Sequence, residues 1–509
     1  MNRKIQKECE STCEYILPDY MGDIKKILNA KAVAVPAGSF QDGDLLVVNG
    51  VVEYEVLYTD SENKLTAVVT TSDYSMNVAV DGDNYVDAIE DSESVNLSIR
   101  ITGPRKITMK SSVACSLTVV EENEIGVEGD VFDGDRSPEC IKTSVEYEES
   151  VFATATEREY AEEAERINGV SADDIEIITT GARVKIIETR SVDNGVEIKG
   201  EIIATAIIKT PQQPPYVIKK SIPFNEIINI EGSSPDMLPS ARGYVTSATC
   251  GVNSDADGAV IVVNTIAEFK AELRENKSTT VVCDAYLKEQ ETKNDYCAFE
   301  YRRAEGVQNS EIVFDMKMPR SEIMLDNVQS ILSSNADIIV SEAEIGRGEV
   351  RFTGEMHISG IACEINADDS VGYLPIKFKL PFDKNVNINC HIPENASVEY
   401  TITPIDCQPS LDGENLYVRC TAVVSVRLYT VHKVDRLKSC ELVEGARYTR
   451  NPSTVTVYYP LDGDSLFRVA KQFHTTPEKI AKDNSLTDSV MSTVGSSESL
   501  NGVKKLIIR

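Results

Sequence analysis

The 509-residue sequence contains no tryptophan and only four histidines. No histidine lies in HExxH or HxH spacing, and the chain has no Walker A, GxGxxG or GxSxG motif. Acidic pairs are too frequent for any one of them to indicate a glycosidase dyad. The missing tryptophan also removes one common platform for stacking sugars. We therefore expect a protein that is not an enzyme, with no catalytic residues and no cofactor or metal site.

Long apolar runs are also missing. No stretch of eighteen apolar residues occurs, so we expect no transmembrane segment. Residues 1–15 contain Lys4, Lys7, Glu8 and Glu10 without an apolar core, which argues against a secretory signal. The sequence thus predicts a protein that stays in the cytoplasm where it is made.

Positive charge is scarce. The chain has 82 acidic and 51 basic residues, a net charge of −31. Nucleic acids and anionic membranes attract positive fields, so neither is an expected partner. The excess acid either keeps the protein soluble or meets a basic partner, and the sequence leaves both interpretations open.

The twelve cysteines form no CxxC motif. In a protein that is not exported, the default is a reduced, buried thiol that packs as a small apolar group. Oxidative cross-linking at a later stage of assembly is the alternative.

A pattern occurs three times along the chain, at intervals of 150 and 154 residues. It consists of an apolar pair, an alanine five residues after the first member of the pair, and a glycine eighteen residues after the alanine. The copies are Ile27-Leu28, Ala32 and Gly50; Ile177-Ile178, Ala182 and Gly200; Ile331-Leu332, Ala336 and Gly354. Such a repeat predicts three copies of one module, with boundaries at 1–143, 144–297 and 298–447.

Most of the chain has the period of two that is typical of strands. Val52, Tyr54 and Val56 fall on one face of such a strand. Asp257-Gly258 and Asp412-Gly413 favour hairpin turns. The fold class that follows is mainly β, with three tandem β-rich modules of similar fold. Residues 154–167 are an exception, because their composition is helical with a strongly acidic face that we interpret as solvated.

An aromatic residue follows each glycine of the repeat. Tyr74 and Phe224 come 24 residues after their glycines, and Phe382 comes 28 residues after Gly354. Pro223 and Pro381 precede the two phenylalanines. The second and third copies are therefore the closer pair.

The pattern changes near residue 454. Val455, Val457 and Tyr459 alternate as in a strand, and an apolar stripe at Leu466, Val469, Ala470 and Phe473 predicts an amphipathic helix that Asp464 can cap. Thr476-Pro477 has the signature of a second helix start, and residues 505–508 form a predicted closing strand. Residues 454–509 therefore predict a small α+β domain of βααβ order.

This tail resembles a LysM domain. The resemblance is carried by Tyr458 or Tyr459, Gly463-Asp464-Ser465-Leu466, Val469-Ala470, Phe473, Thr475-Thr476, Glu478, Ile480, Asn484 and Leu486. It implies a groove for N-acetylglucosamine polymers between the Gly463–Ser465 loop and the loop after the second helix. That second loop is lengthened by the serine-rich residues Met491–Ser499, and the family's glycine sits one position early, at Gly502. Gly463–Ser465 is therefore either a plain turn with a helix cap or part of a glycan site.

With the tail assigned, the three copies resemble the SPOCS module of spore-coat proteins through the apolar pair, the alanine, the glycine-centred strand and the Pro-Phe spacing. Three such modules followed by a LysM domain is the layout of the SipL-type spore-coat morphogenetic family. The resemblance implies a scaffold at the forespore surface in the mother-cell cytoplasm. It also implies that the tail docks a coat-basement ATPase protein.

Three hypotheses follow. The first is a non-enzymatic structural adaptor in spore-coat assembly, with self-association through exposed strand edges as an additional property. The second is a peptidoglycan-binding protein that acts through the tail. The third is a hydrolase with a LysM targeting tail, for which the sequence offers no catalytic residues.

The first helix of the tail and the loop before it hold the candidate contacts for a protein or glycan partner. Phe467 lies off the apolar stripe and is expected to be an exposed aromatic, as interface anchors often are; the alternative is a partly covered surface phenylalanine. The candidate contacts are Asp464, Ser465, Phe467, Arg468 and Lys471.

Overall fold

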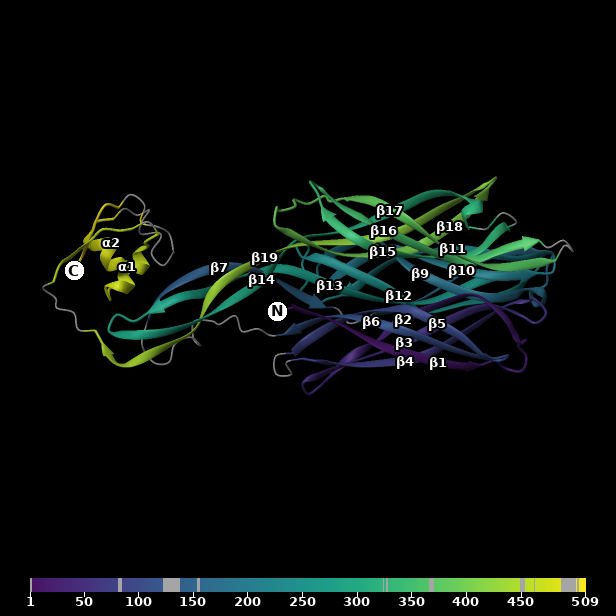
Figure 1. Cartoon of the computed structure of the whole chain (residues 1–509), viewed down its shortest axis with the longest axis horizontal. Helices are drawn as coiled ribbons and strands as arrows, with labels where there is room; N and C mark the ends of the chain where they lie inside the picture. The colour runs from purple at the N-terminus through teal and green to yellow at the C-terminus, as the bar shows by residue number, and fades with distance from the viewer. Residues whose placement is uncertain are drawn as a thin grey trace. The chain divides into compact units, whose positions relative to one another are not determined.

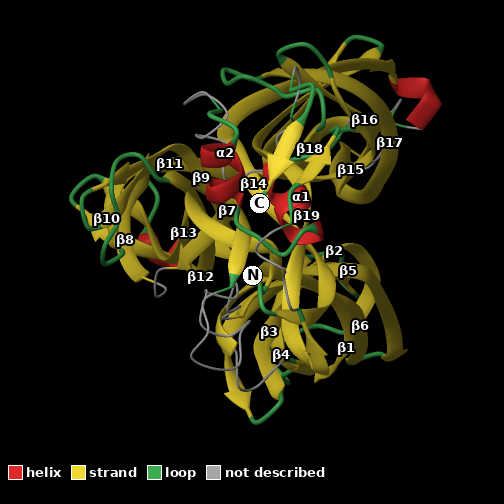
Figure 2. Cartoon of the chain, turned by 90° about the vertical axis from the view of Figure 1, so that its left-hand side faces the viewer, coloured by secondary structure: helices red, strands yellow, loops and turns green. Residues whose placement is uncertain are grey.

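The computed structural model describes residues 2–80, 85–121, 138–152, 156–323, 325, 328–365, 370–448, 454–461, 463–486, 500 and 503–509. Almost all of this part of the chain is strand (Figure 2). Its two α-helices both lie near the C-terminus of the sequence, where Figure 1 labels them. The insertion at Met491–Ser499 and Gly502 lies outside the described residues.

The chain divides into two compact units. The body unit comprises Met1–Glu122, Glu149–Glu275 and Glu305–Tyr429. The tail unit comprises Asn123–Glu148, Asn276–Ala304 and Thr430–Arg509. Four strands have residues in both units, namely β7, β13, β14 and β19. The boundaries at 143, 297 and 447 stay predictions.

Each repeat contributes one regular three-stranded sheet to the body unit, with the strands in chain order, and a second sheet beside it. The regular sheets are β2 (Ile24–Asp42), β3 (Leu45–Asp60) and β4 (Leu65–Ala79); β9 (Glu176–Val192), β10 (Gly195–Thr210) and β11 (Gln213–Asn229); β15 (Val328–Ile345), β16 (Glu349–Ile365) and β17 (Val371–Asn387).

The second sheets use more distant pairings. Their strands are β1 (Asn2–Ile16), β6 (Lys106–Glu121) and β5 (Tyr85–Gly103); β12 (Leu238–Asp255), β13 (Gly258–Tyr286), β7 (Glu139–Phe152) and β8 (Thr156–Asn168); β14 (Gln290–Pro319), β19 (Asn415–Arg447) and β18 (Ala396–Asp412). Two short 3-10 turns, Ala172–Asp174 and Arg320–Ile323, precede β9 and β15. The prediction of a mainly β fold with three similar β-rich modules is confirmed.

The inward faces of the strands form the module cores. Val52, Tyr54 and Val56 are all fully buried, as their alternation predicts. The predicted Asp-Gly turns are also present: Asp255 pairs with Gly258 in the β12–β13 hairpin, and Gly413, with φ of 58°, lies between β18 and β19. Alternation of apolar residues therefore predicted the strand faces, and the Asp-Gly pairs predicted these two turns.

The repeat glycines lie directly opposite the repeat aromatics. Gly50 pairs with Tyr74, Gly200 with Phe224 and Gly354 with Phe382, so the register is the same although the spacing along the chain differs. A Cβ at Gly354 would lie 2.1 Å from the backbone oxygen of Ile339 and 3.0 Å from the Phe382 ring. The missing side chain thus leaves room for an aromatic ring laid across the sheet, as aromatic residues do over strand glycines.

The second residues of the three apolar pairs meet where the three modules contact one another. Leu28 and Leu332 are buried in one cluster, with Ile178 packed against it. The residues 29 positions further along, Leu57, Ile207 and Ile361, belong to the same cluster. We call these six residues the junction; each module supplies two of them from equivalent positions.

Polar contacts between modules lie at and near a cavity of about 330 Å³ beside the junction, whose lining includes Glu55, Thr179, Lys219 and Asp406. Thr179 donates a hydrogen bond to Glu55 over 2.6 Å, joining the first two modules. Arg183 donates to the carbonyl oxygen of Pro404 over 2.8 Å, and Lys219 pairs with Asp406, joining the second and third. The modules are therefore held by apolar packing and by specific polar contacts.

The expectation of a helix over 154–167 is wrong. Thr156–Asn168 is strand β8, which pairs antiparallel with β13 from Thr156 opposite Phe269 to Asn168 opposite Gly258. Backbone pairing along a strand of the same module outweighs the helical preference of Glu, Ala and Arg, because propensity is a weak prior. The acidic side chains remain mostly on the outside.

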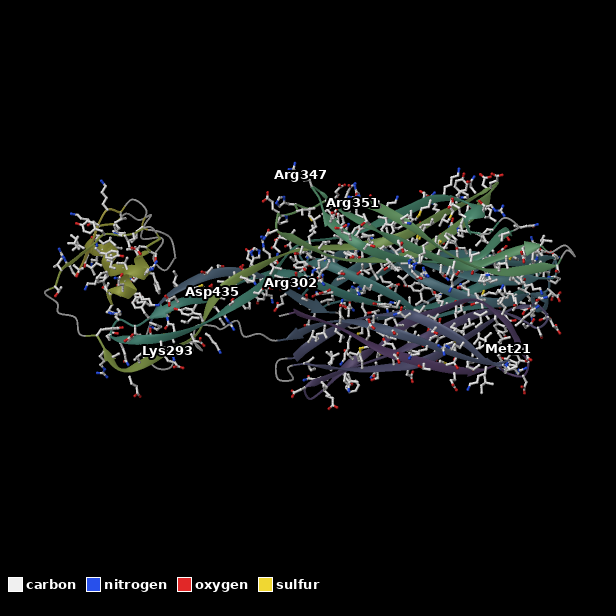
Figure 3. The ribbon with its side chains drawn as sticks, in the orientation of Figure 1. Met21, Lys293, Arg302, Arg347, Arg351 and Asp435 are labelled. Carbon is white, nitrogen blue, oxygen red and sulfur yellow. The ribbon has the colours of Figure 1, made fainter. Side chains whose placement is uncertain are left out.

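The tail unit has two parts. We call the paired strand segments the arm: residues 139–148 of β7, 276–286 of β13, 290–304 of β14 and 430–447 of β19. Exposed charged side chains cover its outside, among them Lys293 and Asp435 (Figure 3).

The other part is the C-terminal domain. It contains β20 (Thr456–Tyr458), α1 (Leu466–Gln472), α2 (Pro477–Asp483) and β21 (Leu506–Ile508), so the predicted βααβ order is confirmed. Strands β20 and β21 pair antiparallel, with Val457 opposite Ile507.

Replacing Gly354 by alanine should lower the free energy of unfolding by about 1–3 kcal/mol, because the new methyl group forces the strand and the Phe382 ring apart. Gly251→Ala is the matched control, since a Cβ there meets no atom within 4 Å. The measurement is the melting temperature of both full-length variants by circular dichroism. Equal melting of the two would contradict the requirement for a glycine opposite Phe382.

Replacing Ile361, which is fully buried at the junction, by alanine should cost about 2–5 kcal/mol. Ile339→Ala, at a position 48% exposed in the same module, should cost far less. Hydrogen exchange of the body unit distinguishes the two: Ile361→Ala should raise exchange in peptides from all three modules. Increased exchange in the third module only would show that the junction does not couple them.

Candidate docking site in the C-terminal tail

The C-terminal domain packs both helices on one face of its two-stranded sheet. Leu506 and Ile508 of β21 point to the helices and are fully buried. The core against them comes mainly from the predicted apolar stripe and from α2. Its buried members are Leu466, Phe467, Val469, Ala470, Ile480, Ala481 and Leu500.

Side-chain caps set the helix starts. The Ser465 hydroxyl accepts a hydrogen bond from the Arg468 backbone N–H over 3.2 Å, and the Thr476 hydroxyl accepts from Lys479 N–H over 3.1 Å with Pro477 in the first turn. The expected cap at Asp464 is therefore wrong by one residue. At the end of α2, the Asn484 side chain both donates to and accepts from the Ile507 backbone, which ties that helix to β21.

Asp464 instead fixes the loop before α1. Its carboxylate accepts from the Tyr458 hydroxyl over 2.7 Å and from the Leu461 N–H over 2.8 Å, and the side chain is buried. Burial by itself raises the pKa of this carboxyl, but the two hydrogen bonds to its ionised form and the nearby Arg468 outweigh burial, so the pKa lies below its usual value. Asp464 thus stabilises the loop from within.

Phe467 is not exposed, contrary to expectation. It is only 4% exposed, and its ring lies edge-on to the Tyr286 ring of the arm, with the centroids 5.2 Å apart. The apolar stripe of α1 does not include Phe467, but the ring belongs to the same buried cluster as that stripe. The stripe could not show that a strand about 180 residues earlier in the chain covers the ring.

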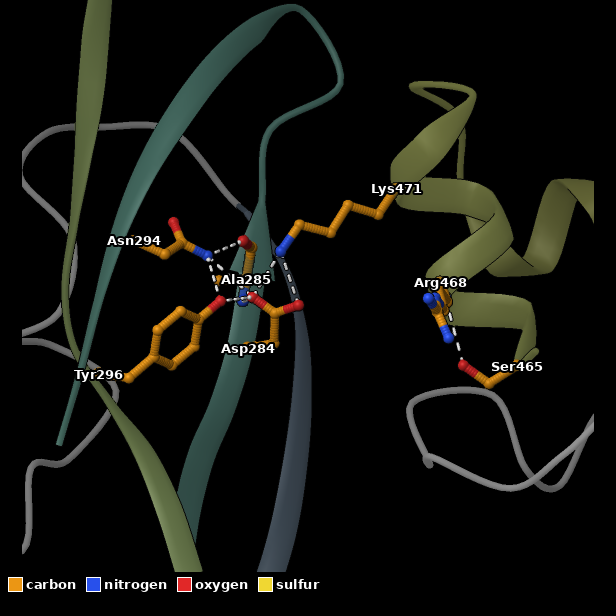
Figure 4. A network of polar contacts seen from close by, with 7 residues as sticks. All are labelled: Asp284, Ala285, Asn294, Tyr296, Ser465, Arg468 and Lys471. Atoms are coloured by element: carbon orange, nitrogen blue, oxygen red, sulfur yellow. Dashed lines mark hydrogen bonds and ion pairs between the residues drawn. The ribbon is translucent and has the colours of Figure 1, made fainter. Parts of the chain in front are cut away.

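Lys471 also contacts the arm. Its ammonium group lies 2.6 Å from both carboxylate oxygens of Asp284 (Figure 4). Asn294 and Tyr296 donate to the same carboxylate over 2.8 and 2.7 Å. Of the five candidate residues, Arg468 is exposed and Lys471 is partly exposed, whereas Asp464, Ser465 and Phe467 are buried.

The sheet of the tail has an open apolar face that the sequence reasoning missed. Val455, Val457, Tyr459 and Leu461 alternate along and beyond β20 and are 60%, 51%, 66% and 72% exposed. We call these four residues the open face. The alternation was visible in the sequence, but it does not show which side of a two-stranded sheet the helices cover.

The described residues offer neither a metal-type cluster nor a disulfide. Within them, no group of three or more His, Cys, Asp or Glu side chains is arranged to hold a metal ion. All twelve cysteines are described, and all are free thiols. Burial raises the pKa of Cys140 to about 11 and also raises that of Cys440, so both stay protonated thiols at neutral pH. Among the helices described, none is long and apolar enough to cross a bilayer.

Comparison with known families agrees with this geometry. The model of the SipL SPOCS domain matches residues 174–253, which include the regular sheet of the second module. The model of the LysM domain matches residues 462–490, which include both helices of the tail. No curated protein and no solved structure matches the chain.

These two domains fit a sporulation-associated adaptor whose LysM tail binds peptidoglycan. The order of the domains is also the one that the sequence predicted. The chain carries a SipL SPOCS domain followed by a C-terminal LysM domain, and both matches agree with the SipL-type layout that the sequence predicted.

Proposed function

We propose that this protein is a non-enzymatic structural adaptor of spore-coat assembly at the forespore surface, and that its tail docks a coat-basement ATPase protein. The observation that carries the proposal is the presence of a SipL SPOCS domain and a C-terminal LysM domain in one chain. Neither domain type is associated with catalysis, and within the described residues no cluster of His, Cys, Asp or Glu is arranged to hold a metal ion.

The open face supports a protein partner. Four large apolar side chains, each more than half exposed on one short stretch of chain, are left uncovered by the described residues of the tail unit. Contiguous exposed apolar patches of this kind mark interaction sites. Arg468 is also exposed in the same domain, and arginine is frequent among interface anchors.

Charge separates the tail from the rest of the chain. Residues 455–509 contain seven basic and six acidic side chains, so they carry a net charge of +1, and the remaining residues carry −32. An acidic partner or an anionic wall polymer is repelled by the rest of the chain but not by the tail. The tail is therefore the part best suited to docking.

The adaptor proposal predicts that Val457→Glu lowers recovery of the coat-basement ATPase protein by about tenfold or more, because a central apolar contact is lost and a charge is buried. The measurement is co-purification with the full-length chain from sporulating cells. Ile227→Glu is the matched control, because Ile227 is 53% exposed on a strand of the body unit. Unchanged recovery with Val457→Glu would place the docking site elsewhere, and no recovery even with the unaltered chain would refute the proposal.

Peptidoglycan binding through the tail is the second candidate, and the LysM match is the observation that favours it. Sedimentation with purified cell wall tests it: the full-length chain should pellet, and a chain without residues 455–509 should not. A full-length chain that stays in the supernatant would remove this candidate.

Asp464 offers a pH-dependent test of the loop that a glycan would meet. Asp464→Ala leaves the Tyr458 hydroxyl and Leu461 N–H without their acceptor and should cost the tail about 1–3 kcal/mol. Because the pKa of Asp464 is lowered on folding, its contribution is fully present above the unfolded value near 4 and is lost as the pH falls through the folded pKa. Hydrogen exchange of tail peptides at pH 7 and pH 3 should therefore show a variant effect that shrinks in acid, whereas an equal effect at both pH values would contradict this role.

A further inference from the structure

The arm presents a surface that is shaped to receive a helix. Ile141 of β7 and Tyr286 of β13 belong to the same buried cluster as the core of the C-terminal domain. Asp284 lies two residues before Tyr286 on the same strand and so on the same face. We call Ile141, Asp284 and Tyr286 the helix seat.

The apolar half of the contact is closely packed. Tyr286 and Phe467 are 3% and 4% exposed, and their rings meet at an interplanar angle of 70°. The Tyr286 hydroxyl donates a hydrogen bond to the Thr475 carbonyl oxygen over 2.7 Å. That carbonyl lies just beyond α1, so the arm satisfies both its own buried hydroxyl and a backbone acceptor of the tail.

The charged part of the contact is organised by the arm itself. The Asp284 carboxylate accepts hydrogen bonds from Asn294 and Tyr296, which both belong to the arm (Figure 4). Lys471 follows Phe467 by four residues, one helical turn, so the ammonium group and the ring reach the arm from one face of α1. Two neighbouring donors therefore orient the acceptor that receives Lys471.

A separate contact ties the end of α1 to the residues that follow the arm. The His474 ring stacks on the Tyr448 ring, and the Tyr448 N–H donates to the Glu289 carbonyl oxygen over 2.9 Å. His474 has φ of 51°, so the chain turns sharply directly after α1. This contact shares no residue with the helix seat.

We propose that α1 stays bound to the arm through Phe467 and Lys471. The arm and the C-terminal domain then act as one recognition unit. A partner then meets the side of the domain that the arm leaves uncovered, which carries the open face. The inference goes beyond the proposed function and does not depend on it, because the contact is defined within this chain.

Charge reversal in the full-length chain tests the proposal without any partner. Asp284→Lys and Lys471→Asp should each raise hydrogen exchange in α1 several-fold, because each places like charges together. The combined variant restores an opposite pair and should return exchange toward that of the unaltered chain. Lys479→Asp, at an exposed position of α2, is the matched control and should leave α1 unchanged.

Phe467→Ala provides an independent measurement on the apolar half. Exchange in α1 and in arm residues 276–296 should rise together by about tenfold or more, as for loss of an interface aromatic. Single reversals that behave like Lys479→Asp, or a combined variant no better than the single ones, would overturn the proposal. So would a Phe467→Ala effect confined to the C-terminal domain, because this outcome shows loss of the domain's own core without release from the arm.

Discussion

The body unit depends on one apolar junction. Leu28, Ile178 and Leu332 come from equivalent positions of the three modules and pack into one cluster. Each of these residues lies on a strand of a regular sheet whose other face fills a module core, so these sheets are buried on both sides at this point. The second residue of each apolar pair therefore packs between modules and not in the core of its own module. The repeated positions thus specify a contact between modules as well as the fold of each module.

Features that depend on nearby residues could be predicted from the sequence. Val52, Tyr54 and Val56, the Asp-Gly turns and the βααβ order follow from local periodicity, and the structure confirms them. The aromatic spacing also had a local cause, since each ring lies over the glycine opposite it. These features depend on residues that are close in sequence or on neighbouring strands.

The failures have one physical origin. Residues 156–168 form a strand because β13, about 100 residues later, offers a backbone to pair with. Phe467 is buried because Tyr286 covers it, and the cap of α1 is Ser465 because Asp464 is engaged by Tyr458. In each case a partner outside the local pattern decided the outcome, and a single sequence does not reveal such partners. The partner contacts proposed for Asp464, Ser465, Arg468 and Lys471 stay predictions.

The position of Tyr286 along the chain has a consequence for synthesis. Its hydroxyl bonds to a carbonyl 189 residues later, and the ring stays uncovered until Phe467 has been made. Most of the arm is made long before α1, so a chain that ends between the arm and α1 has a Tyr286 ring without Phe467 and an Asp284 carboxylate without Lys471. Burial of that ring therefore requires that translation has reached the last domain.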